Sequence, residues 1–196
     1  MEGCMKNGLD HILEKSSKLI AARGYHGTSM RSLAKATDRS LAGLYHYFNN
    51  KEEVLYLINH NGFSYLLTAA QTTDKEDNLS AENKLRSFIS NHVFYFSNHI
   101  DEMKVMMSGT QPLDQKRGGA IRKLKNEYTE VAQNIVKGFV ASKGRHKLAK
   151  TELERKTFLL FGMMNWIFGW YSRQEHGATE ELTQDIFKTF TRGILQ

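Results

Sequence analysis

Proline is nearly absent from this sequence: Pro112 is the only proline in 196 residues. β-Branched residues rarely alternate with polar ones, so no segment predicts a strand or a hairpin. Apolar residues recur instead at helical spacing along most of the chain. The sequence therefore predicts an all-α fold of about nine helices.

Cysteine is equally scarce, because Cys4 is the only one and can form neither an intrachain disulfide nor a cysteine-rich metal site. The longest apolar run, residues 158–171, contains Asn165 and is shorter than the about 20 residues that a membrane span needs. No apolar run of signal-peptide length precedes the charged residues near the N-terminus. We expect a cytoplasmic protein with no membrane partner.

Basic residues outnumber acidic ones, 27 to 21, so the formal net charge is +6. The excess is concentrated in the first 51 residues, which hold eight Lys or Arg against four Asp or Glu. A basic N-terminal region favours a polyanionic partner, although charge alone does not identify it.

The apolar spacing and the capping residues predict where the helices begin and end. The expected helices cover residues 9–23, 30–36, 40–47, 51–70, 80–99, 101–108, 120–142 and 151–173, with a last one from residue 179. The most natural boundary between domains lies near residue 50, where the long fourth helix begins.

Two short helices joined by a tight turn, placed in the basic first quarter, are what a helix-turn-helix motif requires. Leu33 on the first short helix and Leu44 on the second can hold the pair together. Small side chains at 40–43, together with His46, would then face outward and allow the helix to enter a major groove. The motif predicts binding to double-stranded DNA.

The span from Ile12 to Ile58 closely resembles the N-terminal domain of the TetR family of bacterial regulators. The matching segments are residues 23–30 (RGYHGTSM), Leu33-Ala34, Ser40, residues 44–48 (LYHYF) and residues 51–53 (KEE). The resemblance implies a DNA-binding domain in residues 1–50 and a ligand-binding and dimerisation domain in residues 51–196. It implies a homodimer on a palindromic operator, and no catalytic residue, cofactor or metal ion.

The same resemblance implies which residues meet DNA, where phosphate contacts position the protein and base contacts specify the sequence. Phosphate contacts are expected from Thr28, Ser29, Arg31 and Lys51. Base edges are expected to meet Ser40, Leu41, Ala42, Gly43 and His46. Tyr45 and Tyr47 would contact the backbone or support the helix.

The turn departs from the family pattern, because Asp38-Arg39 stands where glycine and an aliphatic residue are usual. Aspartate tolerates the left-handed conformation that the turn needs. Arg39 either covers the core with its stem while its head reaches a phosphate, or leaves the turn loosely packed. The recognition helix that follows Arg39 carries few hydrogen-bonding side chains, so base recognition would depend on His46, Ser40, methyl contacts and DNA shape.

Aromatic and methionine side chains are frequent in the predicted helices between residues 80 and 173. Each one alone is more simply a core residue, but together they favour an apolar cavity for a small effector. The candidate ligand residues are Phe88, His92, Tyr95, Phe96, His99, Met103, Met106, Met107, Tyr128, Phe161, Met164, Asn165 and Phe168. Asn165 could serve either the cavity or a dimer partner, and the two histidines lack the further ligands of a metal site.

Residues 161–171 are similar to the penultimate helix of TetR-type regulators of fatty-acid, steroid and aromatic-acid breakdown. Residues 40–45 are similar to the recognition helix of the same subgroup. This resemblance implies an acyl-CoA thioester as one candidate effector. Arg117, Arg122, Lys123 and Lys125 could bind its phosphates, or they could simply form a solvated helix face.

The last two predicted helices carry more apolar surface than one domain of this size needs, which favours a four-helix dimer interface. Its expected residues are Trp166, Trp170, Phe187 and Phe190. The sequence thus predicts a repressor released from its operator by a small hydrophobic effector. An activator, a regulator without an inducer, a helical lipid carrier and an enzyme are the alternatives, the last disfavoured because no catalytic spacing is present.

Overall fold

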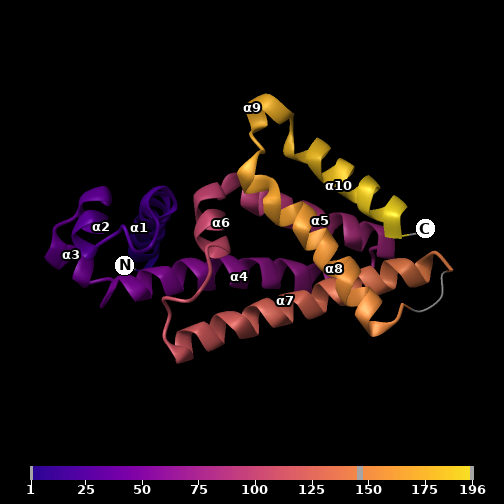
Figure 1. The fold of residues 1–196 in the computed structure, drawn as a ribbon, viewed down its shortest axis with the longest axis horizontal. Coiled ribbons are helices and arrows are strands. Elements are labelled where there is room, and N and C mark those ends of the chain that lie inside the picture. The colour runs from indigo at the N-terminus through magenta and orange to yellow at the C-terminus, as the bar shows by residue number, and fades with distance from the viewer. Residues whose placement is uncertain (1, 145–147, 195–196) are drawn as a thin grey trace. The chain divides into compact units, whose positions relative to one another are not determined.

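The computed structural model describes residues 2–144 and 148–194 (Figure 1). Every regular element in these ranges is helical, so the all-α prediction is confirmed. The helices are α1 (Glu2–Arg23), α2 (Met30–Ala36), α3 (Leu41–Tyr45), α4 (Lys51–Lys75), α5 (Ala81–Asn98), α6 (Ile100–Met107), α7 (Gln115–Ser142), α8 (Lys150–Asn165), the 3₁₀ helix η1 (Trp166–Gly169), α9 (Arg173–His176) and α10 (Thr179–Ile194). Within the described residues, none of them is long and apolar enough to cross a membrane.

The chain forms two compact units, which we call the head unit and the body unit. The head unit contains the residues up to Gly62 together with Ile100–Lys123. The body unit contains Phe63–His99 and the residues from Leu124 onward. Both α4 and α7 contribute residues to each unit, so this division is not the functional division near residue 50, which stays a prediction.

The core of the head unit joins α1, α2, α3, α4 and α6. Leu33 of α2 and Leu44 of α3 are completely buried in it, together with Ile12 of α1 and Val54 of α4. Val105 brings α6 into the same cluster, and α6 lies against α1. In the body unit, α10 lies alongside α5, as Figure 1 shows.

The predicted helix over residues 151–173 is interrupted. α8 ends at Asn165, and η1 and α9 follow before the chain reaches α10. Gly169 weakens a helix at this point because glycine loses much conformational freedom when it is held helical. Tyr171 is buried, and its hydroxyl donates to the carbonyl oxygen of Gly177 at 3.0 Å. These contacts stabilise the 3₁₀ helix and the bend that follows it.

The turn between α2 and α3 contains Asp38 with φ of 55°, the one non-glycine residue with positive φ in the described chain. The expected left-handed conformation is therefore present. The N–H of Arg39 donates to the carbonyl oxygen of Ala34 at 2.9 Å and closes the turn. Ser40 then caps α3, since its Oγ accepts from the N–H of Gly43 at 2.9 Å.

Asp38→Val should destabilise the protein, because a β-branched residue is strained in the left-handed region. We expect the free energy of unfolding to fall by about 1–2 kcal/mol. Asp38→Gly is the matched control and should stay within about 1 kcal/mol of the native protein. Urea unfolding followed by circular dichroism measures both; equal stability of the two variants would contradict the role of the turn.

Candidate functional site

α3 and the residues next to it are exposed on the head unit. Leu44 is buried and fixes the helix, while Tyr45 and Leu41 keep 49% and 36% of their surface exposed. Of the residues expected at base edges, Ser40, Leu41, Ala42 and His46 are exposed and Gly43 is half-buried. The structure thus presents them together on one accessible helix, and their contacts with bases stay a prediction.

The residues expected to contact phosphates differ in their exposure to solvent. Arg31 and Ser29 are exposed, and Ser29 also caps α2 by accepting from the N–H of Ser32 at 3.2 Å. Thr28 is buried, and its hydroxyl donates to the carbonyl oxygen of Gly24 at 2.9 Å. In this conformation the Thr28 side chain therefore stabilises the loop before α2 and is not open to a phosphate.

Lys51, the first residue of α4, holds the same loop. Its Nζ donates to the carbonyl oxygens of Tyr25 at 2.7 Å and Thr28 at 2.6 Å, and it lies 4.0 Å from the centroid of the Tyr25 ring. Partial burial lowers the pKa of the Lys51 ammonium. Because an ammonium has three donors, one N–H remains for a phosphate.

The structure argues against one of the two alternatives for Arg39, the loosely packed turn. Leu33 and Leu44 beside the turn are completely buried, so the arginine does not leave it loosely packed. The Arg39 side chain is exposed, and its guanidinium carbon lies 4.9 Å from the centroid of the Tyr47 ring. The head group is therefore held on the surface by an aromatic face.

Sequence reasoning missed Glu52, which connects α4 to the segment between α6 and α7. Its Oε1 accepts from the backbone N–H of Asp114 at 2.7 Å and lies 3.5 Å from Nη1 of Arg117. Asp114 in turn caps α7 by accepting from the N–H of Arg117 at 2.7 Å, a hydrogen bond that lowers the pKa of the Asp114 carboxyl. Arg117, one of the cations considered for CoA phosphates, is thus already paired.

A buried polar centre lies in the body unit, on α5, α7 and α8. His92 is 2% exposed; its Nδ1 lies 2.7 Å from the hydroxyl of Tyr128, and its Nε2 lies 3.0 Å from Oδ1 of Asn165. Burial lowers the pKa of His92 to about 3, so the ring is neutral at physiological pH. A neutral ring has one donor and one acceptor, so Nε2–H donates to Asn165 while the Tyr128 hydroxyl donates to Nδ1.

Aromatic rings surround this centre. The centroids of Phe96 and Phe161 lie 4.5 Å and 6.2 Å from that of His92, and Phe88 lies 5.5 Å from Tyr128. Met164 is also buried in the body unit. Asn165, for which a dimer contact was an alternative, is bonded to His92 of its own chain.

The remaining ligand candidates lie elsewhere. His99 is exposed and stacks on Tyr95 at 4.6 Å, so it does not pair with His92. Met103 and Met106 are buried in the head unit, and Met107 is partly buried beside them in sequence. Phe168 is partly buried in η1. Among the described residues no three His, Cys, Asp or Glu side chains gather as a metal ion requires.

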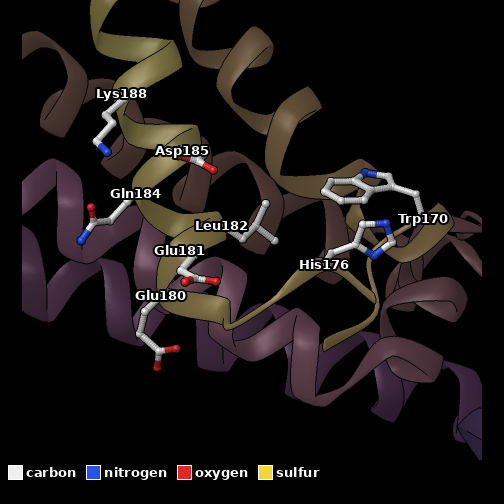
Figure 2. Close-up of a pocket in the computed structure, with 8 residues that line it drawn as sticks. All are labelled: Trp170, His176, Glu180, Glu181, Leu182, Gln184, Asp185 and Lys188. Atoms are coloured by element: carbon white, nitrogen blue, oxygen red, sulfur yellow. The ribbon is translucent and has the colours of Figure 1, made fainter. Parts of the chain in front are cut away.

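A hollow of about 570 Å³ lies between the α9 region and α10 (Figure 2). It is lined by Trp170, His176, Glu180, Glu181, Leu182, Gln184, Asp185 and Lys188. None of the residues expected to bind the effector lines it. The hollow therefore does not correspond to the predicted apolar cavity.

The expected dimer residues divide into two pairs. Trp166 and Trp170 keep 64% and 44% of their surface exposed. Phe187 and Phe190 are only 5% and 6% exposed, because α10 buries them within its own chain. Buried side chains add little area to an interface, so the exposed pair fits a dimer surface and the buried pair does not.

Comparison with known families agrees with this architecture. The family profile "Bacterial regulatory proteins, tetR family" matches residues 12–56, and "Tetracyclin repressor-like, C-terminal domain" matches residues 78–194. The chain belongs to the TetR family. The TetR prediction and the helix-turn-helix are thus confirmed, and the protein is a DNA-binding transcription regulator, not an enzyme.

Individual TetR-family members are similar at modest identity. The biofilm operon icaADBC HTH-type negative transcriptional regulator IcaR of Staphylococcus aureus (strain Newman) is 23% identical over 172 residues, covering 88% of this chain and 89% of IcaR. PfmR from Thermus thermophilus is 25% identical with a TM-score of 0.81, covering 94% and 99% of the two chains. AibR, solved with isovaleryl coenzyme A and operator DNA, is 22% identical with a TM-score of 0.78, covering 93% and 97%.

The buried neutral His92 should make stability depend on pH. An unfolded histidine has a pKa near 6.5, whereas His92 in the folded chain has one of about 3. Between these values the unfolded chain binds a proton that the folded chain does not, so stability falls as the pH falls. Relative to His92→Gln, which cannot titrate, the native protein should lose up to about 1.4 kcal/mol per pH unit between about pH 6 and about pH 4. Urea unfolding at several pH values measures this loss, and parallel curves for the two proteins would contradict it.

Proposed function

We propose that this protein is a homodimeric repressor that occupies a palindromic operator and leaves it when a small apolar effector binds. The observation that carries the proposal is the exposed α3, held by buried Leu44 and presenting Tyr45 and His46 to solvent. Similarity to IcaR, a negative transcriptional regulator, supports repression over activation.

The head would recognise DNA with few hydrogen bonds to bases. The Ser40 oxygen accepts the capping hydrogen bond of α3, so its O–H donor remains for a base, and Leu41 and Ala42 can make only apolar contacts, for example with thymine methyl groups. His46 is then the main side chain available for direct recognition. Arg31, Ser29 and the remaining N–H of Lys51 would hold phosphates on either side of the groove.

Exposed apolar side chains on α8, on η1 and at the residue after η1 support the proposed dimer. Besides Trp166 and Trp170, they are Phe158 and Leu159, which keep 60% and 66% of their surface exposed. Four large apolar side chains exposed along one stretch are unusual for a monomer and typical of an interface between copies. A dimer would place two α3 helices about 34 Å apart, one helical turn of DNA.

The centre formed by His92, Tyr128 and Asn165 supports an effector with a polar group on an apolar body. The three side chains satisfy one another in this structure, so a bound carbonyl would have to take over one of their hydrogen bonds. The half-buried Lys125, 4.8 Å from the centroid of Phe63, adds a cation to the body unit. A polar carbonyl on an apolar chain, together with anionic groups, describes an acyl-CoA, and AibR was solved with one.

Effector binding must favour the state that does not bind DNA, because a ligand with equal affinity for both states shifts nothing. α4 contains residues of both units, and Glu52 near its start is bonded to Asp114 and Arg117. A change in α4 would therefore alter the position of the head on the operator.

Selection from a pool of genomic fragments should yield a palindromic site, and recovery of no preferred sequence would refute the proposed function. On that site, His46→Ala should reduce the preference over single-base variants, with about 1–3 kcal/mol of discrimination lost per contacted base pair. Lys51→Met should instead weaken binding to all variants nearly equally. Fluorescence anisotropy distinguishes these patterns, and the reverse assignment would contradict the proposed roles.

Isovaleryl-CoA and longer acyl-CoA thioesters should weaken binding to the selected site, while free CoA should have much less effect. We expect the apparent affinity for DNA to fall roughly 5- to 150-fold, the usual range of coupling between two sites. Tyr128→Phe, which removes one hydroxyl from the buried centre, should reduce this response with little change in DNA affinity. If no thioester in the series changes DNA binding, the acyl-CoA assignment is wrong while the operator proposal stands.

A further inference from the structure

The turn of the helix-turn-helix carries an arginine whose head group lies over an aromatic ring and, among the described residues, forms no hydrogen bond or ion pair. Asp38, in its left-handed conformation, turns the chain so that Arg39 precedes the cap of α3. The Arg39 guanidinium lies on the Tyr47 ring, 4.9 Å from its centroid, and the side chain is exposed. This is a cation–π contact, in which the attraction is to the ring face and not to a hydrogen-bond acceptor.

Tyr47 is similarly placed. Within the described chain, neither its hydroxyl nor the Arg39 guanidinium has a hydrogen bond or an ion pair, and both lie beside Gly8 of α1. A Cβ at Gly8 would lie 3.6 Å from the Tyr47 hydroxyl and 3.8 Å from Nη2 of Arg39. Gly8 of α1 therefore lies next to both groups.

We propose that Arg39 and Tyr47 form a phosphate clamp, in which the guanidinium edge and the phenol hydroxyl bind oxygens of one DNA phosphate. This inference rests on the proposed operator binding. The edge of a guanidinium matches two phosphate oxygens, and each such bond is charge-assisted. The cation–π contact with Tyr47 already restricts the arginine, so less side-chain freedom is lost when DNA binds. The clamp joins the turn before α3 to the residues after it, and it would fix the register of α3 along the groove.

The experiment measures the affinity for the selected duplex over a range of salt concentrations. Arg39→Met should weaken binding about tenfold, as removal of a charge-assisted hydrogen bond does. The slope of log affinity against log salt should become shallower by about 0.9 for each phosphate that the protein no longer neutralises. The fold-change should be the same on single-base variants of the duplex. Lys137→Met, at an exposed position of α7 in the body unit, removes one positive charge and should leave the slope unchanged.

Two further variants separate the clamp from a general charge effect. Arg39→Lys retains the charge without the planar fork, so it should keep most of the salt slope while binding several-fold more weakly. Tyr47→Leu removes the platform and the hydroxyl. Because the two residues act as one unit, Arg39→Met with Tyr47→Leu should lose less affinity than the product of the two single losses.

The clamp is refuted if Arg39→Met leaves the salt slope unchanged. An unchanged slope together with a lower melting temperature of the variant would show that Arg39 is only structural. The clamp is also refuted if the loss of affinity differs between single-base variants, since that pattern indicates base recognition. In either case the native protein still selects a DNA sequence, whereas failure of the operator proposal would leave no selected duplex at all.

Discussion

Burial of Leu33 and Leu44 in the core of the head unit is the contact on which the DNA-binding surface depends. α2 has seven residues and α3 five, and helices this short are not stable alone in water. They exist here because each places a completely buried leucine against α1 and α4. Each helix also begins with a serine cap, which satisfies backbone donors that so short a helix cannot pair itself. The opposite side of α3 is left free for a ligand.

Polar side chains at the start of α4 hold the neighbouring segments of the head unit by hydrogen bonds. Lys51 bonds two carbonyl oxygens of the loop before α2, and Glu52 beside it bonds the segment before α7. The first turn of α4 thus joins three parts of the head unit. Lys51 stabilises the protein with two of its donors, whereas the Arg39 guanidinium forms no hydrogen bond to any of the described residues.

The body unit presents the opposite problem, because a polar centre is buried among aromatic rings. His92, Tyr128 and Asn165 can be buried there because each forms a hydrogen bond with another of the three. Burial lowers the pKa of His92, so the histidine is neutral. Such an arrangement requires α5, α7 and α8 to meet in one register. It provides a polar anchor inside an otherwise apolar region, where an effector with a single carbonyl could be oriented.

The sequence by itself determined the helical class, the bounds of α2, the left-handed Asp38 and the family, because these follow from local spacing and backbone preference. It did not predict the break after Asn165, since the apolar helical pattern continues through that point, and the burial of Tyr171 that opposes a continuous helix is a tertiary feature. Nor could it predict the partners of His92, Glu52 and Lys51, or the burial of Phe187. Those were decided by the tertiary structure, because hydrogen bonds and burial between residues 23 to 73 positions apart depend on how helices pack, which local periodicity does not encode.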